Sequence, residues 1–96
     1  MIFGDLVVQA SFKSMEVIKK MVETGNPNSV TDAGVGALCA RSAVIGAFMN
    51  VRINAAGFDD KAFVIDIINK GREIENKAIV LEAEILKTVN EKIGIE

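Results

Sequence analysis

Residues 25–54 read GNPNSVTDAGVGALCARSAVIGAFMNVRIN, and this stretch decides the fold. After a turn of Asn, Pro and Ser, Ser29 and Asp32 match the acidic variant of a capping box, which predicts a helix from Val30 to about Ala56. Each glycine inside a helix costs roughly 1 kcal/mol relative to alanine, so we expect a neighbouring helix or a flat ligand to pack closely here. The small residues that recur at helical spacing are Ala33, Gly36, Ala40, Ala43 and Ala47.

Amphipathic helices are predicted on both sides of this central one. Residues 2–24 carry an apolar stripe with 4-3-4-3-4 spacing, and Gly25 is the expected stop. Residues 60–93 carry a longer stripe that we expect to form the core, with Asp59 as the N-cap and Gly94 at the end. The first stripe contains Phe3, Val7, Ala10, Ser14, Val17 and Met21, widened by Leu6, Met15, Ile18 and Val22. The second contains Val64, Ile67, Gly71, Ile74, Ala78, Leu81 and Ile85.

Three helices joined by tight turns predict a single all-α domain over residues 1–96. The third helix alone would run for about 50 Å at 1.5 Å per residue, whereas a compact chain of this size has a radius of gyration of about 12–13 Å. We therefore expect an elongated up-down bundle of three long helices. Half of the residues are hydrophobic, more than a small monomer can bury. A homodimer or higher homo-oligomer, formed through the helical faces, is expected to complete the bundle.

Composition argues against several classes of function. The net charge is -2 and the lysines are spread out, so no nucleic-acid partner is expected. There is no His, and Cys39 is the single cysteine, so we expect neither a metal site nor an internal disulfide. The N-terminus lacks the basic region of a signal peptide. Arg41 interrupts the most apolar stretch, residues 33–49, so we expect no membrane span and a cytoplasmic location.

The central stretch resembles the cyclodeaminase domain of formiminotransferase-cyclodeaminase and the related bacterial methenyltetrahydrofolate cyclohydrolases. The resemblance rests on the GN-x-NS turn, the [ST]-D-A-G-V helix start and the GA-x-x-NVRIN end. It implies a dimeric, all-helical bundle that removes ammonia from formiminotetrahydrofolate or hydrolyses a methenyl bridge. The implied ligand is a tetrahydrofolate derivative. The family domain is longer, and this chain looks like its C-terminal half. The N-terminal helices, which carry a catalytic aspartate and much of the folate pocket in the family, have no counterpart here.

Asp32 is the candidate catalytic residue. In the first turn of the predicted helix, the helix dipole would favour its ionised form. A carboxylate there could orient a water or stabilise the cationic carbon of a methenyl substrate. The alternative is that Asp32 only caps the helix together with Ser29, and the two roles are compatible.

Asn50 and Asn54 are candidates for binding the pterin ring. They lie four residues apart, on one helix face, and continue the line of small residues. An amide offers both a donor and an acceptor, which suits the amino-keto edge of a pterin. The alternative for Asn50 is an interhelical hydrogen bond to a neighbour's backbone. For Asn54, near the helix end, the alternative is capping.

Arg52 and the turn residues complete the candidate substrate-binding set. Arg41 and Arg52 are eleven residues apart and so share a face opposite the two asparagines. Arginine recognises carboxylates bidentately, and folates carry a glutamate tail, although solvated or salt-bridged arginines are the alternative. Asn28 and Ser29 could donate to a carboxylate near the helix N-terminus, but turn chemistry explains them equally well.

Two classes of function remain open on the sequence. The first is an enzyme of the folate cyclodeaminase or cyclohydrolase type, in which Asp32 acts on a ring held by the asparagines. The second is a non-catalytic helical module, which binds a ligand, or forms one subunit of a larger complex, or is a vestigial half-domain.

Overall fold

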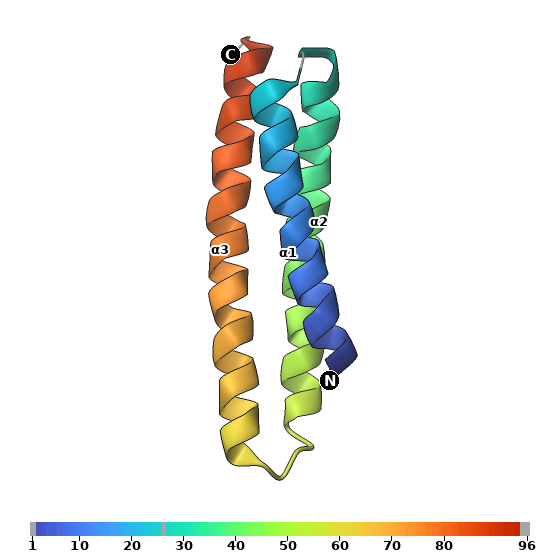
Figure 1. The fold of residues 1–96 in the computed structure, drawn as a ribbon, viewed down its shortest axis with the longest axis vertical. Coiled ribbons are helices and arrows are strands. Elements are labelled where there is room, and N and C mark those ends of the chain that lie inside the picture. The colour runs from blue at the N-terminus through green and yellow to red at the C-terminus, as the bar shows by residue number, and fades with distance from the viewer. Residues whose placement is uncertain (1, 26, 95–96) are drawn as a thin grey trace.

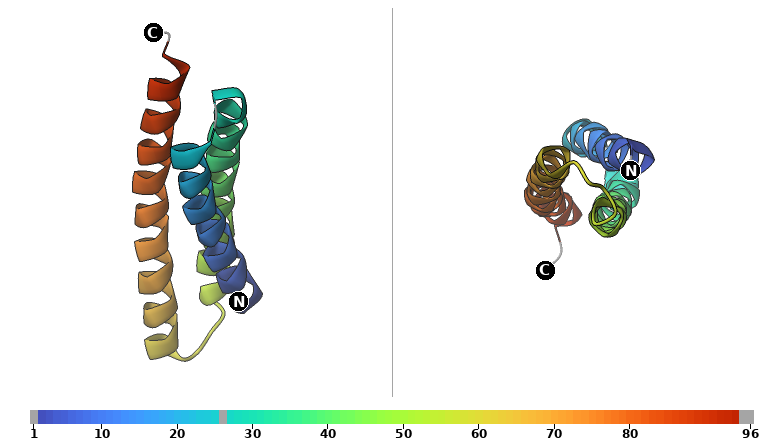
Figure 2. Two further views of the ribbon diagram at one scale, coloured as in Figure 1. Left: turned by 45° about the horizontal axis from the view of Figure 1, so that its top comes forward. Right: turned by 90° about the horizontal axis from the view of Figure 1, so that it is seen from below.

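The structure is a computed structural model that describes residues 2–25 and 27–94. Within these residues the chain forms three long helices in an up-down arrangement and contains no strand (Figure 1). Viewed along the long axis, the helices occupy the corners of a triangle (Figure 2). The predicted all-α class and the three-helix architecture are therefore confirmed. The helices are α1 (Ile2–Thr24), α2 (Pro27–Ala55) and α3 (Lys61–Ile93).

The bundle is elongated, as its helix lengths predict. Its principal extents are 53 × 19 × 16 Å and its radius of gyration is 15.5 Å. The helices differ in length, with 23 residues in α1, 29 in α2 and 33 in α3. The N-terminus consequently lies short of the connection between α2 and α3, and the last turns at that end are a two-helix hairpin (Figure 1).

The core runs along the bundle axis in two adjoining clusters. The first contains Val8, Met15, Val44, Phe48, Val51 and Ala78. The second contains Val22, Val30, Ala37, Ile85 and Val89. Phe48 is the largest of the fully buried side chains and sits between α2 and α3. On α3 the predicted core stripe is confirmed, because its central members are buried and the flanking ones pack against the clusters.

The predicted stripe of α1 is wrong in its main line, whereas Met15 and Val22, which were predicted to widen it, are buried. Val17 and Met21 are 58% and 55% exposed, whereas Val8, Met15 and Val22, seven residues apart, are buried. The helix is apolar on two sides, and α2 and α3 together can cover only one of them. The side of α1 that faces neither α2 nor α3 therefore has exposed aliphatic side chains.

Two predicted helix starts also need correction. α2 begins at Pro27 rather than Val30, because proline has no N–H to leave unpaired and its fixed φ suits the first helical position. Ser29 and Asp32 therefore lie inside the helix, in its third and sixth positions, and Ser29 is not the N-cap that the capping box requires. Asp60, not Asp59, caps α3, and its side chain accepts a 3.1 Å hydrogen bond from the backbone N–H of Phe63.

Glycines on facing helices set the interhelical spacing. A Cβ added at Gly36 would lie 3.3 Å from Cδ1 of Ile18 on α1, which confirms the expected close approach along that side of α2. A Cβ added at Gly71 of α3 would lie 2.3 Å from the Phe48 ring, so this ring fits only against a bare backbone. Gly46 differs from both, because a Cβ there would meet nothing within 4 Å.

Lys92 near the end of α3 holds the end of α1. Its ammonium donates to the carbonyl oxygens of Val22, Glu23 and Gly25, the last two at 3.0 and 3.3 Å. These carbonyls lack partners within their own helix, and a cation complements the negative end of the helix dipole. The contact joins segments that are nearly 70 residues apart in the chain.

One helix of the described chain, Ser29–Ala55 of α2, is long and apolar enough to cross a membrane by length and composition, with a mean hydropathy of 1.4. A helix packed in the core of a globular protein passes the same test. Residue 41, in its middle, is an arginine that pairs with Glu82 of α3.

Candidate functional site

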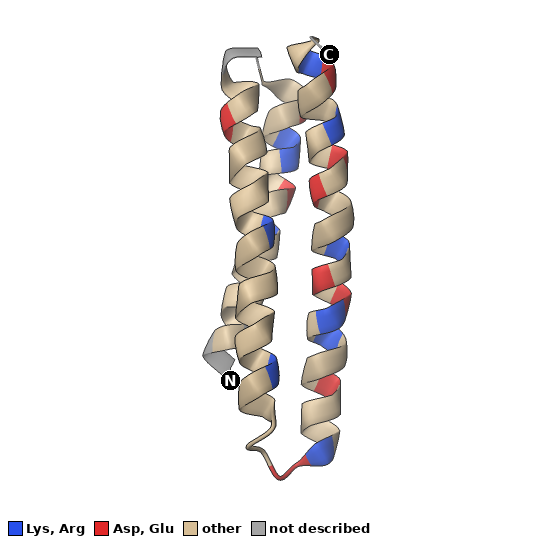
Figure 3. Cartoon of the chain, turned by 180° about the vertical axis from the view of Figure 1, so that it is seen from behind, with Lys and Arg blue, Asp and Glu red and all other residues tan. Residues whose placement is uncertain are grey.

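The three charged residues of α2 lie on two sides of the helix, with the two arginines on one side and Asp32 on another. Arg41 pairs with Glu82 of α3, and Arg52 shares the Phe48 ring with Arg72 of α3, so both arginines lie toward α3. Figure 3 shows the basic positions of α2 on the edge that faces α3. The side chains of Arg41 and Glu82 form an ion pair and are only 35% and 14% exposed. For Arg41 the salt-bridged alternative therefore holds, and this guanidinium is engaged within the fold.

Arg52 stacks on the aromatic core residue beneath it. Its guanidinium carbon lies 4.9 Å from the centroid of the Phe48 ring, and that of Arg72 lies 5.8 Å from the same centroid. Such cation–π contacts are worth about 0.5–1 kcal/mol at exposed sites. Arg52 itself is exposed, so its guanidinium remains accessible while the contact with Phe48 fixes its direction.

Asp32 is exposed on the second turn of α2. The earlier helix start moves it beyond the first turn, where the N-terminal dipole acts most strongly. Among the described residues its carboxylate has no hydrogen-bonding or ion-pair partner. The carboxylate is therefore available to a ligand or to another chain.

Asn50 and Asn54 are both exposed on α2. Neither side-chain amide has a hydrogen-bonding partner in the described part of the chain, so the interhelical bond considered for Asn50 and the cap considered for Asn54 are absent. An unpaired amide on the surface costs nothing while water solvates it, and it keeps its donor and its acceptor for a ligand. Both amides are therefore accessible from solvent, and binding of a ligand by them stays a prediction.

One chain does not bring the candidate residues together. Asp32 and Asn50 lie 18 residues apart on the same straight helix, which at 1.5 Å per residue separates them by about 27 Å. A single pterin ring cannot contact both. Ser29 is exposed at the start of α2, near Asp32, whereas Arg52 lies at the far end with the asparagines. The side chain of Asn28 lies outside the described residues.

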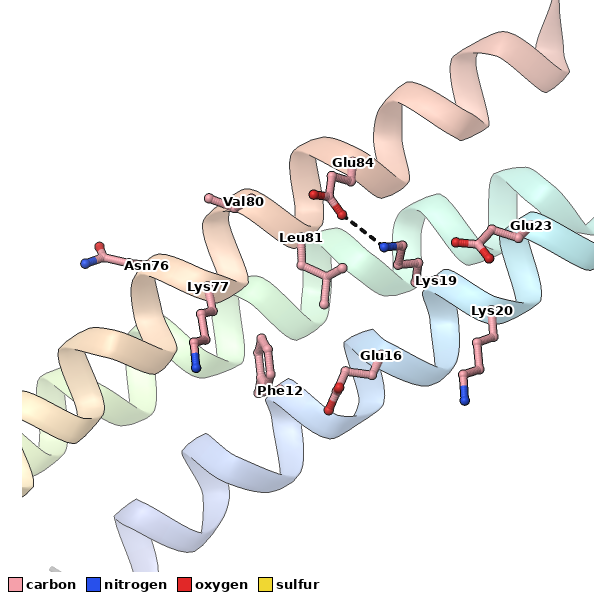
Figure 4. Close-up of a pocket in the computed structure, with 10 residues that line it drawn as sticks. All are labelled: Phe12, Glu16, Lys19, Lys20, Glu23, Asn76, Lys77, Val80, Leu81 and Glu84. Atoms are coloured by element: carbon pink, nitrogen blue, oxygen red, sulfur yellow. Dashed lines mark hydrogen bonds and ion pairs between the residues drawn. The ribbon is translucent and has the colours of Figure 1, made fainter.

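A separate groove lies between α1 and α3 (Figure 4). Its volume is about 610 Å³. The side chains of Phe12 and Leu81 form an apolar floor, and Lys19 bridges to Glu84 across the groove at 3.2 Å. The other lining residues are Glu16, Lys20, Glu23, Asn76, Lys77 and Val80.

The groove offers binding surface but little chemistry. Its rim carries three lysines and three glutamates, so it favours neither an anion nor a cation strongly. No group of three or more His, Cys, Asp or Glu that could hold a metal occurs among the described residues. Sequence reasoning missed this groove, although residues 12, 16, 19 and 23 follow a 4-3-4 spacing that marks one helix side. That spacing indicates a stripe on α1 but cannot indicate which helix faces it.

The described helices define an all-helical domain, and comparison of the sequence with known proteins shows its family. The chain belongs to the formiminotransferase-cyclodeaminase family, whose model matches residues 6–73. The match includes all of α2 and so every candidate site residue, and the predicted resemblance is confirmed.

A particular relative is the methenyltetrahydrofolate cyclohydrolase of Methylorubrum extorquens. It is 33% identical over 80 residues, which are 83% of this chain and 38% of the relative. This chain therefore spans well under half of the relative's length. No solved structure matches the chain.

Proposed function

We propose that this protein binds a formimino- or methenyl-tetrahydrofolate in the cytoplasm, as a homo-oligomer, and acts on it as a cyclodeaminase or cyclohydrolase. The observation that carries the proposal is the family match, which covers all of α2 with its candidate residues. The exposed and unpartnered Asp32, Asn50 and Asn54 support it, because the fold does not use their polar atoms.

The proposed chemistry assigns each group one task. Hydrolysis of a methenyl bridge requires water to add to the cationic carbon, a base to take the water's proton, and a carbon–nitrogen bond to break. Asp32 is the proposed base or electrostatic partner of that carbon. Asn50 and Asn54 are proposed to hold the pterin edge, while Arg52 would pair with the glutamate tail. Asn28 and Ser29 would bind near the start of α2.

Absorbance of methenyltetrahydrofolate in the presence of the purified protein tests the proposal. Loss of the methenyl absorbance faster than in buffer, abolished by Asp32→Asn, is the expected result. Asn50→Ala should weaken binding without lowering the melting temperature, because no group among the described residues is hydrogen-bonded to this amide. Hydrolysis at the uncatalysed rate, together with no thermal shift on adding folate, would contradict the proposal.

The second candidate function is a non-catalytic binding or assembly module. It is favoured by the distance of about 27 Å between Asp32 and Asn50, which leaves one chain without an enclosed pocket at these residues. Saturable folate binding by equilibrium dialysis, without turnover by any assembly of this chain, would select this alternative.

A further inference from the structure

We propose that α2 pairs with α2 of a second copy of this chain, antiparallel, about a two-fold axis between Ser42 and Gly46. The pairing places Asp32 of one copy beside Asn54 of the other, so that each ligand site is built by two chains. The shared ligand site rests on the proposed folate function, whereas the pairing itself does not.

The first support is a regular seam on the outward side of α2. Its members keep the 4-3-4-3-4 spacing of a helix–helix interface, although neither α1 nor α3, as far as the structure describes them, covers this side. Val35, Met49 and Ile53 are 60%, 55% and 74% exposed. The seam consists of Val35, Cys39, Ser42, Gly46, Met49 and Ile53.

The second support is the absence of charge on this seam. α2 carries three charged residues, of which Arg41 and Arg52 contact residues of the interface with α3 and Asp32 precedes the seam in the sequence. A second copy therefore meets no like charge when it docks along the seam. A charged surface of another protein would find no opposite charge on the seam. The uncharged apolar seam of a second copy, by contrast, is complementary to it.

The third support is the order of side-chain sizes. A two-fold interface must be self-complementary, with residue i on j and j on i. About an axis between Ser42 and Gly46, Val35 meets Ile53 of the second copy and Ser42 meets its Gly46. Aliphatic side chains thus pair at both ends and small ones in the middle. A Cβ at Gly46 meets nothing within 4 Å inside the chain, so this position is open for close approach of the second helix.

The pairing gathers the candidate residues that one chain keeps apart. With the same axis, Asp32 lies level with Ala56 of the second copy, and within about 3 Å along the helix of that copy's Asn54. In one chain the same two residues are about 33 Å apart. In the antiparallel pair, the start of α2 in one copy lies beside the end of α2 in the other, and the two together form one site.

Asp32 and Asn54 also lie on the same side of the seam. Asn54 is 18 residues, five full turns, from Gly36, which packs against Ile18 of α1. It therefore lies on the α1 side, and Asp32 lies between that side and the outward face. A two-fold axis perpendicular to the helices keeps this flank on one side of the pair. A ligand bound there contacts Asp32 from one copy and Asn54 from the other.

Light scattering after size exclusion tests the pairing. The wild type should have twice the 10.3 kDa mass of the chain, and Gly46→Glu should be a folded monomer because its side chain enters open space. Asn69→Glu, exposed on α3, is the control that adds the same charge elsewhere and should remain a dimer. A monomeric wild type, or Gly46→Glu dimerising as well as Asn69→Glu, would overturn the pairing.

Cys39 reports which face is covered. It is exposed in one chain and lies within the seam, so its reaction with a maleimide should slow at least about tenfold in the dimer and stay fast in Gly46→Glu. A dimer in which Cys39 reacts as fast as in the monomer uses another face and refutes the proposal. Binding of the monomeric wild type to phosphatidylcholine vesicles, with Cys39 protected there, would identify a membrane as the occupant instead.

Mixed dimers test the shared site. Asp32→Asn and Asn54→Ala chains should each fail to bind methenyltetrahydrofolate, while an equal mixture regains about a quarter of the wild-type sites, since half of the dimers are mixed and each has one intact site. Binding by the wild type without recovery in the mixture would refute the shared site and leave the proposed function standing. No binding by the wild type would refute the proposed function, whereas the mass and Cys39 results would still decide the pairing.

Discussion

Gly71 and Gly46 are both glycines inside helices, yet the structure gives them opposite surroundings. We expect Gly71→Ala to destabilise the fold by about 1–2 kcal/mol, because overpacking against Phe48 outweighs the gain of roughly 1 kcal/mol in helix propensity. Gly46→Ala should stabilise the monomer by about 0.5–1 kcal/mol, at protein concentrations that dissociate the proposed dimer, since within one chain its methyl group meets no atom. Urea unfolding of both variants measures the difference, and equal effects would contradict this account of Gly71.

Lys92 is expected to matter through the backbone of α1. Lys92→Met keeps an apolar stem but leaves three carbonyl oxygens at the end of α1 without this donor. The expected cost is about 1–2 kcal/mol in the free energy of unfolding. Lys87→Met on the exposed side of α3 is the control and should change it by less than about 0.5 kcal/mol. A similar loss in both variants would show that net charge, rather than this contact, is responsible.

Single residues were predictable where their role is local. Gly94 adopts the left-handed conformation, with φ of 73°, that a helix-ending glycine favours. Lys92 was not predictable, because its partners lie at the far end of the chain and nothing in its neighbourhood indicates them. For Asn50 the sequence left two interpretations open, and only the tertiary structure removes the structural one.

The N-cap of α3 separates two adjacent aspartates. Asp60→Ala should destabilise the protein by about 1 kcal/mol, because it removes the acceptor of the Phe63 N–H. Asp59→Ala is the matched control and should have little effect on thermal unfolding. If Asp59→Ala costs as much as Asp60→Ala, the loss comes from charge near the helix N-terminus and the cap bond contributes little.

Whole elements were predictable from their periodicity, but the side that each helix buries was not always so. The longest regular apolar stripe of α3 is the one that the structure buries, although Ile65, Ile79 and Val80 lie outside it and are exposed. α1 has apolar residues on two sides, and the buried side depends on where α2 and α3 lie. α2 is apolar nearly all round, so its sequence predicts burial on more sides than two neighbours can cover.

At the scale of the molecule, the sequence predicted the elongated bundle and the family, whereas the site was predictable only as a set of residues. Asp32 and Asn50 share one helix side, and it is the straightness of α2 that keeps them far apart. Distances along a helix follow from residue numbers alone. Which second surface faces that side depends on docking, and a single sequence contains no pattern that fixes it.

The unequal helix lengths have a consequence for the order in which the molecule opens. Beyond the start of α1, the hairpin of α2 and α3 lacks a third helix, and Phe58 and Ile65 there are 41% and 60% exposed. Amide hydrogens in the first turns of α3 should therefore exchange with deuterium well before those around Phe48. Opening of this end breaks few buried contacts, so it costs less free energy than global unfolding and occurs more often. Uniform protection along α3 would show instead that the whole bundle unfolds as one cooperative unit.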